Sequence, residues 1–379
     1  MHWVTKRFCV LQVGIVLGVS CLPADSISWR EMIGRGTRAF ENGDYGEAER
    51  AYQVALEAAR KTGSSGARIA TTLNNLALVK RRLGRYAEAE RLYKRARSLW
   101  ETAGDRGHPA ASVVLHNLGE LYALQGRTAA AEQSLRAALS RSEESAGPNH
   151  PQTAAILDSL GKLLAGRGRY REAERAHDRA LALRERELGS GAPEVAHSLN
   201  NLGAVYLQTR RATQAEELFR RALAIQETEL GPSHPQAAAT LNNLAQACRA
   251  LGRWDQADSF YRRAAAITEE ALGERHPETA TVYANWAELS FAQGRHADAE
   301  WRFQRALFIL QSGLGTEHPA VAAVQLSYAA LLRKTNRKRE AAELETAARD
   351  SLRRSEAAAA VDWHALRKPV NEPPNKAIR

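Results

Sequence analysis

Apolar side chains recur at helical spacing along most of the chain and are separated by short turn segments. After Pro151, the apolar positions are three or four residues apart, at Ile156, Leu157, Leu160, Leu163 and Leu164, which is the spacing of one face of a helix. Pro151 suits the first turn of such a helix because its missing N–H is not needed there. A turn follows at Gly166 and Gly168, and the segment from Glu172 to Leu188 predicts a second helix that stops at Gly189. The pattern therefore predicts a helical hairpin.

The hairpin pattern returns every 42 residues. The prolines of six dipeptides keep this step: His108-Pro109, His150-Pro151, Ala192-Pro193, His234-Pro235, His276-Pro277 and His318-Pro319. Two alanine series keep it as well, at Ala89, Ala131, Ala173, Ala215, Ala257, Ala299 and Ala341, and at Ala96, Ala138, Ala180, Ala222, Ala264, Ala306 and Ala348. Between the two alanines lies a bulky position, filled by Tyr93, Leu135, His177, Phe219, Tyr261 and Phe303. Series locked to one period predict a repeat array.

A single hairpin cannot bury its apolar stripe, so neighbouring hairpins must stack. We therefore predict an all-α array over residues 28–354, with about eight units near 28–66, 67–108, 109–150, 151–192, 193–234, 235–276, 277–318 and 319–354. Gly or Ala at fixed places, as at Gly161, is expected to let one helix backbone approach the next, and the large residue four positions after the alanine of the first series is expected to fill the space beside it. The pattern fades after residue 354, so residues 355–379 are expected to extend the last helix as a cap and then to form a disordered tail.

The first residues have a different character. Lys6 and Arg7 precede an apolar run from Phe8 to Val19, and the residues from Pro23 to Ser26 are turn-prone. This order is typical of a secretory signal peptide, so we expect residues 1–24 to be a leader and the protein to be exported, to the bacterial periplasm or out of the cell. The run is shorter than the roughly 20 apolar residues of a transmembrane helix. An uncleaved signal anchor and a cytosolic chain with an apolar start remain as alternatives.

A second feature of this segment concerns Cys21. The stretch from Gly18 to Cys21 is similar to a bacterial lipobox, in which Cys21 would become the lipidated first residue of the mature chain. Gly18 stands where a lipobox usually has Leu. Lipidation at Cys21 is therefore an alternative fate of the leader, and it would anchor the protein to a membrane.

Composition narrows the function classes. The chain of 379 residues has 53 Lys+Arg against 43 Asp+Glu, a net charge of +10 and only 3 Cys. These figures exclude a disulfide-stapled miniprotein, a collagen and a polytopic membrane protein. The positive charge is spread along the array, with clusters at Lys80 to Arg82 and Lys334 to Arg339, and it favours no more than weak adhesion to anionic polymers or lipids. Cys248 lies on an apolar helix face and is expected to be a buried, inert thiol.

The repeats resemble tetratricopeptide repeats, specifically the 42-residue kind of kinesin light chains. The resemblance rests on units such as Leu241 to Ala245 with Leu251 to Trp254 and Tyr261 to Ala264, and Leu73 to Ala77 with Leu83 to Glu90. It covers residues 28 to 354 and implies a right-handed superhelical solenoid of stacked antiparallel hairpins, whose first helices line a concave wall that meets ligands. Kinesin light chains carry an N-terminal heptad segment that pairs with the motor. A signal-like segment stands in its place here, so no motor role is implied.

An asparagine ladder runs along the predicted first helices. Asn75, Asn117, Asn201, Asn243 and Asn285 occupy one position at the 42-residue step, with Ser159 and Ser327 as its other members, and a flanking polar series holds Asn74, His116, Asp158, Asn200 and Asn242. Asn is a poor helix former, and its amide can both donate to and accept from the backbone of an extended peptide. The resemblance implies the same contact, so we predict that the eight asparagines bind peptide. The alternative is that they bridge adjacent repeats by hydrogen bonds.

Motifs for catalysis and metal binding are missing from the sequence. No GxxxxGK[ST], HExxH, GxSxG or CxxC occurs, and the Glu runs alternate with Arg as on a solvated helix face. Histidines of successive His-Pro pairs are one repeat apart, and packed helices are about 8–10 Å apart, too far to share a zinc ion with ligands at about 2 Å. We therefore expect no cofactor, no metal and no catalysis. No module for sequence-specific nucleic-acid binding is recognisable.

These inferences combine into one predicted function. The protein is expected to be an exported, non-catalytic scaffold that binds a partner peptide or helix along its concave wall. Two alternatives stay open, namely a rigid assembly subunit of an envelope complex that uses its convex face or end caps, and a regulatory or sensor module that works with a separate enzyme. Membrane contact is expected only through a lipid anchor or an uncleaved signal.

Overall fold

The computed structural model describes residues 27–61, 66–102 and 109–365. The expected leader at residues 1–24, Cys21 and the expected tail after Ala365 lie outside these ranges. Sixteen helices and no strand occur in the part of the chain that the structure describes. The predicted all-α fold of eight antiparallel hairpins is therefore confirmed.

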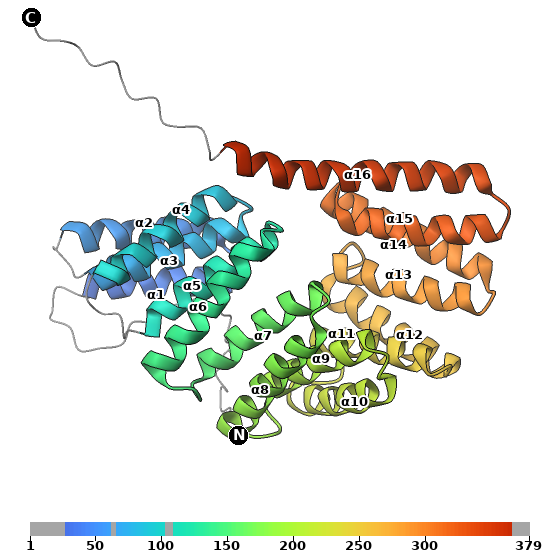
Figure 1. Cartoon of the computed structure of the whole chain (residues 1–379), viewed down its shortest axis with the longest axis horizontal. Coiled ribbons are helices and arrows are strands. Elements are labelled where there is room, and N and C mark those ends of the chain that lie inside the picture. The colour runs from blue at the N-terminus through green and yellow to red at the C-terminus, as the bar shows by residue number, and fades with distance from the viewer. Residues whose placement is uncertain (1–26, 62–65, 103–108, 366–379) are drawn as a thin grey trace, which may run out of the picture. The chain divides into compact units, whose positions relative to one another are not determined.

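The helices fall into two units of four hairpins each (Figure 1). Unit 1, Met1–Ser190, contains α1 (Ile27–Glu41), α2 (Tyr45–Lys61), α3 (Gly66–Arg82), α4 (Tyr86–Thr102), α5 (Pro109–Leu124), α6 (Thr128–Ala146), α7 (Pro151–Gly166) and α8 (Tyr170–Leu188). Unit 2, Gly191–Arg379, contains α9 (Pro193–Gln208), α10 (Ala212–Glu229), α11 (Pro235–Ala250), α12 (Trp254–Leu272), α13 (Pro277–Ala292), α14 (His296–Leu314), α15 (Pro319–Lys334) and α16 (Lys338–Ala365). None of the described helices is long and apolar enough to span a bilayer.

Within each unit, a hairpin packs on its neighbours in sequence. The second helix of one hairpin contacts the first helix of the next, as α2 contacts α3 and α10 contacts α11. First helices also contact one another across hairpins, in the rows α3–α5–α7 and α9–α11–α13–α15, whereas second helices of the described chain make no comparable contacts. The packing is therefore tighter on the side of the odd-numbered helices. We call the surface of these helices the first-helix face.

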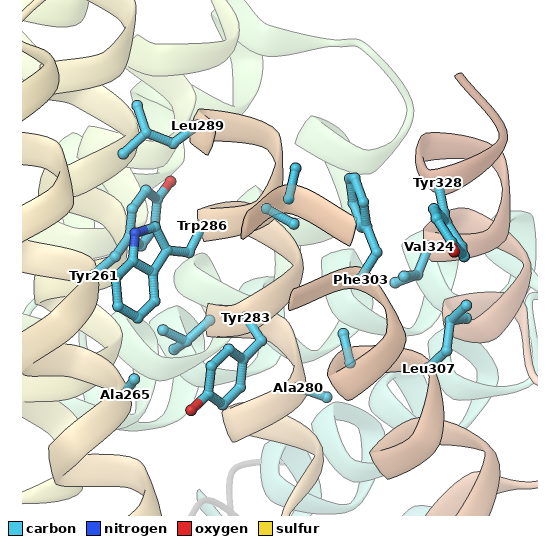
Figure 2. Packing of buried hydrophobic residues seen from close by; sticks show 14 of the residues in the cluster. Tyr261, Ala265, Ala280, Tyr283, Trp286, Leu289, Phe303, Leu307, Val324 and Tyr328 are labelled. Atoms are coloured by element: carbon cyan, nitrogen blue, oxygen red, sulfur yellow. The ribbon is translucent and has the colours of Figure 1, made fainter. Parts of the chain in front are cut away.

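The apolar core of unit 2 is continuous from α11 to α16. Figure 2 shows Tyr261, Tyr283, Trp286, Phe303 and Tyr328 packed between neighbouring hairpins. Small residues create the space for such rings. In α9, for example, a Cβ added to Gly203 would lie 2.5 Å from a ring carbon of Phe219, a distance at which the ring would have to move. At Gly203 the absence of a side chain is thus a packing requirement.

The His-Pro pairs begin the first helices. The Nδ1 atoms of His150, His234, His276 and His318 accept a hydrogen bond from the backbone N–H two residues on, at 3.1–3.3 Å, and Pro follows at the first helical position. Each histidine thereby satisfies one of the unpaired N–H groups at a helix start. The sequence predicted a turn here but not this capping role. Within the described ranges, no group of three or more His, Cys, Asp and Glu side chains is arranged to hold a metal ion.

A series of ion pairs links consecutive hairpins. An acid on one second helix contacts an arginine in the turn of the following hairpin, 37 residues on, in the pairs Glu90–Arg127 (2.8 Å), Glu132–Arg169 (2.6 Å), Glu216–Arg253 (2.8 Å), Asp258–Arg295 (2.8 Å) and Glu300–Arg337 (2.5 Å). We call these contacts the turn ion pairs. They relate one second helix to the next turn in the same way at these five steps.

Candidate functional site

The eight candidate asparagines all lie on first helices, in two sets. The set in unit 1 is buried and consists of Asn74 and Asn75 on α3 and Asn117 on α5. The set in unit 2 consists of Asn200 and Asn201 on α9, Asn242 and Asn243 on α11, and Asn285 on α13, and all of these except Asn242 are partly exposed. The structure therefore separates the ladder into an enclosed part and an accessible part.

Several of these amides bridge neighbouring hairpins. Asn117 Nδ2 donates to Asn74 Oδ1 at 2.9 Å, and Asn285 Nδ2 donates to Asn242 Oδ1 at 2.9 Å. Asn200 Nδ2 donates to Thr240 Oγ1 at 2.6 Å and so joins α9 to α11. The two Asn–Asn bonds join residues 43 positions apart. In each bond, a ladder asparagine donates to the asparagine of the flanking series in the preceding hairpin. These are the contacts that the bridging alternative predicts.

Asn201 and Asn243 differ from the bridging amides. Asn201 Nδ2 has no hydrogen-bond partner among the described residues, and Asn243 Oδ1 lies 3.5 Å from Asn242 Nδ2, at the long limit of a hydrogen bond. The two residues stand on adjacent helices, α9 and α11, which contact each other. The unpaired nitrogen of Asn201 is buried, so an extended peptide would have to pair with the exposed atoms of these two side chains.

A polar chain that the sequence analysis missed lies on the first helices of unit 2. Arg249 Nη2 on α11 is 3.4 Å from Glu288 Oε2 on α13, and Ser327 Oγ on α15 donates to Glu288 Oε1 at 3.3 Å. The three side chains belong to three consecutive first helices. They add one positive and one negative group, both partly exposed, to the first-helix face.

The same polar chain occurs in unit 1, four repeats earlier in the sequence. Arg81 Nη1 lies 2.8 Å from Glu120 Oε2, and Ser159 Oγ donates to Glu120 Oε1 at 2.9 Å. Burial opposes ionisation of Glu120, but His116 and Arg81 outweigh it and lower the pKa of the carboxyl below its usual value. The recurrence of Arg, Glu and Ser at a separation of four repeats was the sequence signal for both chains.

His116 adds an imidazole to the polar chain of unit 1. Burial lowers the pKa of His116 to about 4, so the ring is neutral near pH 7. Its Nε2 lies 2.8 Å from Ser159 Oγ, but the hydroxyl proton of Ser159 is donated to Glu120. A catalytic base would have to accept that proton, and the ring is fully buried. The cluster therefore positions helices rather than activating a nucleophile.

A second buried polar cluster occupies the bulky position of α8. His177 Nδ1 lies 2.8 Å from Asp158 Oδ1 on α7, and Arg184 pairs with the other carboxylate oxygen of Asp158. His177 and Asp158 are both buried. Asp158, a member of the flanking series, thus lies in the core and not on the first-helix face.

The basic clusters and Cys248 contribute nothing further to a site. Lys80 pairs with Glu49 at 2.5 Å, Arg333 pairs with Glu345 at 2.6 Å, and Arg337 belongs to a turn ion pair. Much of the local positive charge is therefore neutralised by neighbouring acids. Cys248 is buried, as expected, and burial raises the pKa of its thiol.

Solved structures share this fold at low sequence identity. The apo form of the quorum sensor NprR from B. thuringiensis superposes with a TM-score of 0.65 and 15% identity, covering 88% of this chain and 89% of that chain. A Rap protein complexed with Competence and Sporulation Factor has a TM-score of 0.63 and 14% identity, with 89% of each chain covered. BtubC (BKLC) from P. vanneervenii has a TM-score of 0.51 and 22% identity, covering 66% of this chain and 94% of that chain. At these identities the likeness establishes the fold alone.

Sequence comparison identifies the family of the chain. A search among curated proteins returned no match. The family pattern described as Tetratricopeptide repeat, however, matches residues 68–144, 131–186, 194–270, 236–310 and 278–354. These ranges cover well over half of the chain and coincide with the stacked hairpins. The chain therefore belongs to the tetratricopeptide repeat family.

Proposed function

We propose that this protein is a non-catalytic protein-binding scaffold that holds an extended peptide segment of a partner against the first-helix face of unit 2. The observation that carries the proposal is the pair Asn201 and Asn243, two partly exposed residues on adjacent first helices; the amide nitrogen of Asn201 is itself buried and has no partner among the described residues. Amides of this kind recognise peptide backbone without regard to side chains.

The surroundings of the pair support the same mode of binding. Ala204 lies one turn after Asn201 on α9, Ala239 lies one turn before Asn243 on α11, and both are exposed. Residues three or four apart share one helix face, so these small side chains leave a peptide room to approach the amides. Arg249 on α11 and Glu288 on α13 are partly exposed on neighbouring first helices of the same unit and offer both signs of charge to the side chains of a peptide.

The comparisons support a protein partner at the level of the fold. The Rap protein that shares this fold was solved in complex with Competence and Sporulation Factor. A fold of this type is therefore able to hold a partner, and the chemistry of Asn201 and Asn243 favours a peptide.

The test uses the full chain and two sets of variants. The double variant Asn201→Ala with Asn243→Ala is expected to weaken binding of the partners captured from an envelope extract at least tenfold, with helicity unchanged. Asn117→Ala is the matched control because it removes a buried bridging amide of unit 1. It is expected to lower the stability and to leave the affinity unchanged.

Three results would count against the proposal. Equal affinity of the double variant and the parent would remove these amides from the binding surface. Partners retained by the double variant would indicate that the binding surface lies on the second helices or the end hairpins, as expected for an assembly subunit. Loss of binding in Asn117→Ala alone would assign it to unit 1.

We also propose that the protein is exported. Basic residues, an apolar run and turn-prone residues in positions 1–26 support a leader. N-terminal sequencing and mass analysis of the protein from fractionated cells tests this proposal. A start near residue 25 or a lipid on Cys21 would support it, and an intact Met1 in the cytosol would refute it.

A further inference from the structure

The ladder asparagines of unit 2 offer acceptor oxygens to a ligand. On α9, Asn201 is partly exposed but its Nδ2 is buried, so Oδ1 is the atom of this amide that can face a ligand. On α13, Asn285 donates from Nδ2 to Asn242 Oδ1 at 2.9 Å, which leaves its own Oδ1 to accept. An amide oxygen accepts hydrogen bonds and cannot donate them. A ligand that pairs with the ladder must therefore supply N–H donors.

These amides recur at the spacing of packed helices. Asn201, Asn243 and Asn285 occupy the same position of α9, α11 and α13, one 42-residue repeat apart, and consecutive helices of this row contact each other. The axes of packed helices lie about 8–10 Å apart. The ladder thus presents one amide about every 8–10 Å to a peptide that crosses the first helices.

This spacing discriminates between the conformations that a peptide can adopt. A polyproline II helix has three residues per turn and rises about 3.1 Å per residue, so the same face returns about every 9.3 Å. A β-strand returns to the same face about every 6.6–6.8 Å and falls out of step with the ladder after one repeat. An α-helix returns after seven residues, about 10.5 Å, but its N–H groups are already bonded within the helix. Only polyproline II combines the matching period with unpaired N–H groups.

Small side chains border the ladder in unit 2. The residues four positions before and three positions after a ladder residue lie on the same helix face. Five of these eight residues are small and exposed, namely Ala204, Ala239, Thr281, Ala323 and Ala330, and the other three are His197, Gln246 and Glu288. A peptide backbone can therefore approach the amides, provided that the peptide residues facing them are small as well.

We propose that the ladder of unit 2 binds a partner segment in the polyproline II conformation, with a small residue that carries an N–H at every third position and proline accepted at the two positions between. This inference rests on the proposed function and specifies the class of peptide. Asn201, Asn243, Asn285 and Ser327 span three ladder steps, so the bound segment has about ten residues, at three per step. Prolines between the contacts hold the segment in its bound conformation and reduce the entropy lost on binding.

Titration calorimetry of the full chain with four synthetic peptides, each with an acetyl group and a terminal amide, tests the proposal. Four copies of Ala-Pro-Pro place an N–H at every third residue. Twelve prolines keep the conformation but have no N–H within the chain, and three copies of Ala-Pro-Pro-Pro shift the period to four. Four copies of Ala-Gly-Ser carry an N–H at every residue but are flexible.

The Ala-Pro-Pro peptide is expected to bind most tightly. The all-proline peptide is expected to bind at least tenfold more weakly because it loses every hydrogen bond to the ladder. The period-four peptide and the flexible peptide are each expected to bind about fivefold more weakly, the first through lost register and the second through the cost of ordering.

Variants of the chain locate the peptide on the ladder. The double variant Asn201→Ala with Asn243→Ala is expected to bind the Ala-Pro-Pro peptide at least tenfold more weakly than the parent. Asn117→Ala removes a buried bridging amide of unit 1 and is expected to leave this affinity unchanged, which makes it the matched control.

Any of four results would overturn the proposal. These are no binding of any peptide at millimolar concentration, equal affinity for the Ala-Pro-Pro and all-proline peptides, equal affinity for periods three and four, and a flexible peptide that binds as tightly as Ala-Pro-Pro. If captured partners depend on Asn201 and Asn243 while one of these results is found, the proposed function stands and the polyproline II class falls. If captured partners are indifferent to the two amides, both fall.

Discussion

The two units build the same polar chain on their first helices and enclose it to different degrees. In unit 1 the side chains of Arg81 and Glu120 are 9% and 29% exposed and 2.8 Å apart, whereas in unit 2 Arg249 and Glu288 are 36% and 39% exposed and 3.4 Å apart. Opposite charges attract more strongly where less water surrounds them. The same three residue types therefore hold helices together in unit 1 and remain partly exposed in unit 2, which supports the proposal that a partner binds unit 2.

A second difference concerns the last hairpin of each unit. Asp158, His177 and Arg184 form a buried polar cluster in unit 1, whereas the corresponding residues four repeats later are Leu326, Glu345 and Leu352. The same three helix positions can thus hold either a buried polar cluster or a set that includes two leucines. It follows that the small residues and the turn ion pairs, which recur in both units, set the hairpin geometry.

The largest loss of stability is expected from breaking the buried polar cluster of Asp158, His177 and Arg184 in unit 1. Asp158→Ala removes the carboxylate that receives His177 and Arg184, and breaking a buried ionic contact on one side costs about 3–5 kcal/mol. The free energy of unfolding, measured by urea denaturation, is expected to fall by this amount.

An apolar replacement of the whole cluster provides the control. The triple variant Asp158→Leu, His177→Phe and Arg184→Leu is expected to be as stable as the parent or more stable, because no charge stays buried. A cost below about 1 kcal/mol for Asp158→Ala would contradict a structural role for the cluster.

A smaller effect is expected from pH at His116, which unit 2 replaces by Ala284. The pKa of the buried ring is about 4, compared with 6.5 for an ordinary histidine. Between these values the unfolded chain binds a proton that the folded chain does not, so stability falls as the pH is lowered from 6.5 to 4 and is unaffected above 6.5. The loss amounts to about 3 kcal/mol at most, at 1.36 kcal/mol for each pKa unit.

His116→Asn isolates this effect because Asn occupies the corresponding position in three other repeats, at Asn74, Asn200 and Asn242. Urea denaturation at several pH values is expected to show a flatter pH dependence for the variant than for the parent. Identical slopes between pH 6.5 and 4 would show that the ring is accessible to protons in the folded state.

The smallest losses of stability are expected from replacing glycine by alanine in unit 1 and alanine by glycine in unit 2 at equivalent first-helix positions. A Cβ on Gly161 would lie 2.5 Å from His177 Nε2, and overpacking of this kind costs about 1–3 kcal/mol. The reverse change in unit 2, Ala245→Gly, is expected to cost about 0.5–1 kcal/mol through the flexibility of glycine in a helix. Thermal unfolding measures both.

Gly166→Ala is the matched control for this exchange, because nothing lies within 4 Å of the added carbon. It is expected to raise the stability slightly. A Gly161→Ala variant that behaves like Gly166→Ala would mean that His177 moves aside without cost, and that the glycine is not needed.

The hairpins were predictable because their signals are local and repeated. Pro151, Gly189 and the alanine series mark helix starts, helix ends and close packing within one 42-residue step. The contacts between hairpins were not predictable in the same way. Asn117 bonds Asn74 rather than Asn75, and that one-residue difference depends on how adjacent helices are rotated against each other.

The turn ion pairs, which the sequence analysis also missed, had a sequence signal of their own. Arg127, Arg169, Arg253, Arg295 and Arg337 keep the 42-residue step, but arginine and glutamate on exposed helices also indicate a solvated surface. Only the fold brings each arginine to an acid 37 residues earlier.

The turn ion pairs have a consequence for how such a gene can grow or shrink. The segments 109–150, 235–276 and 277–318 each supply an acid for the segment after them and an arginine for the segment before them. A segment copied in tandem by recombination therefore arrives with both halves of its junctions already matched, and a deleted segment leaves neighbours that still fit. Because contacts are confined to adjacent repeats, selection can alter the length of the protein in whole modules and change a single surface, such as the first-helix face of unit 2, without rebuilding the rest.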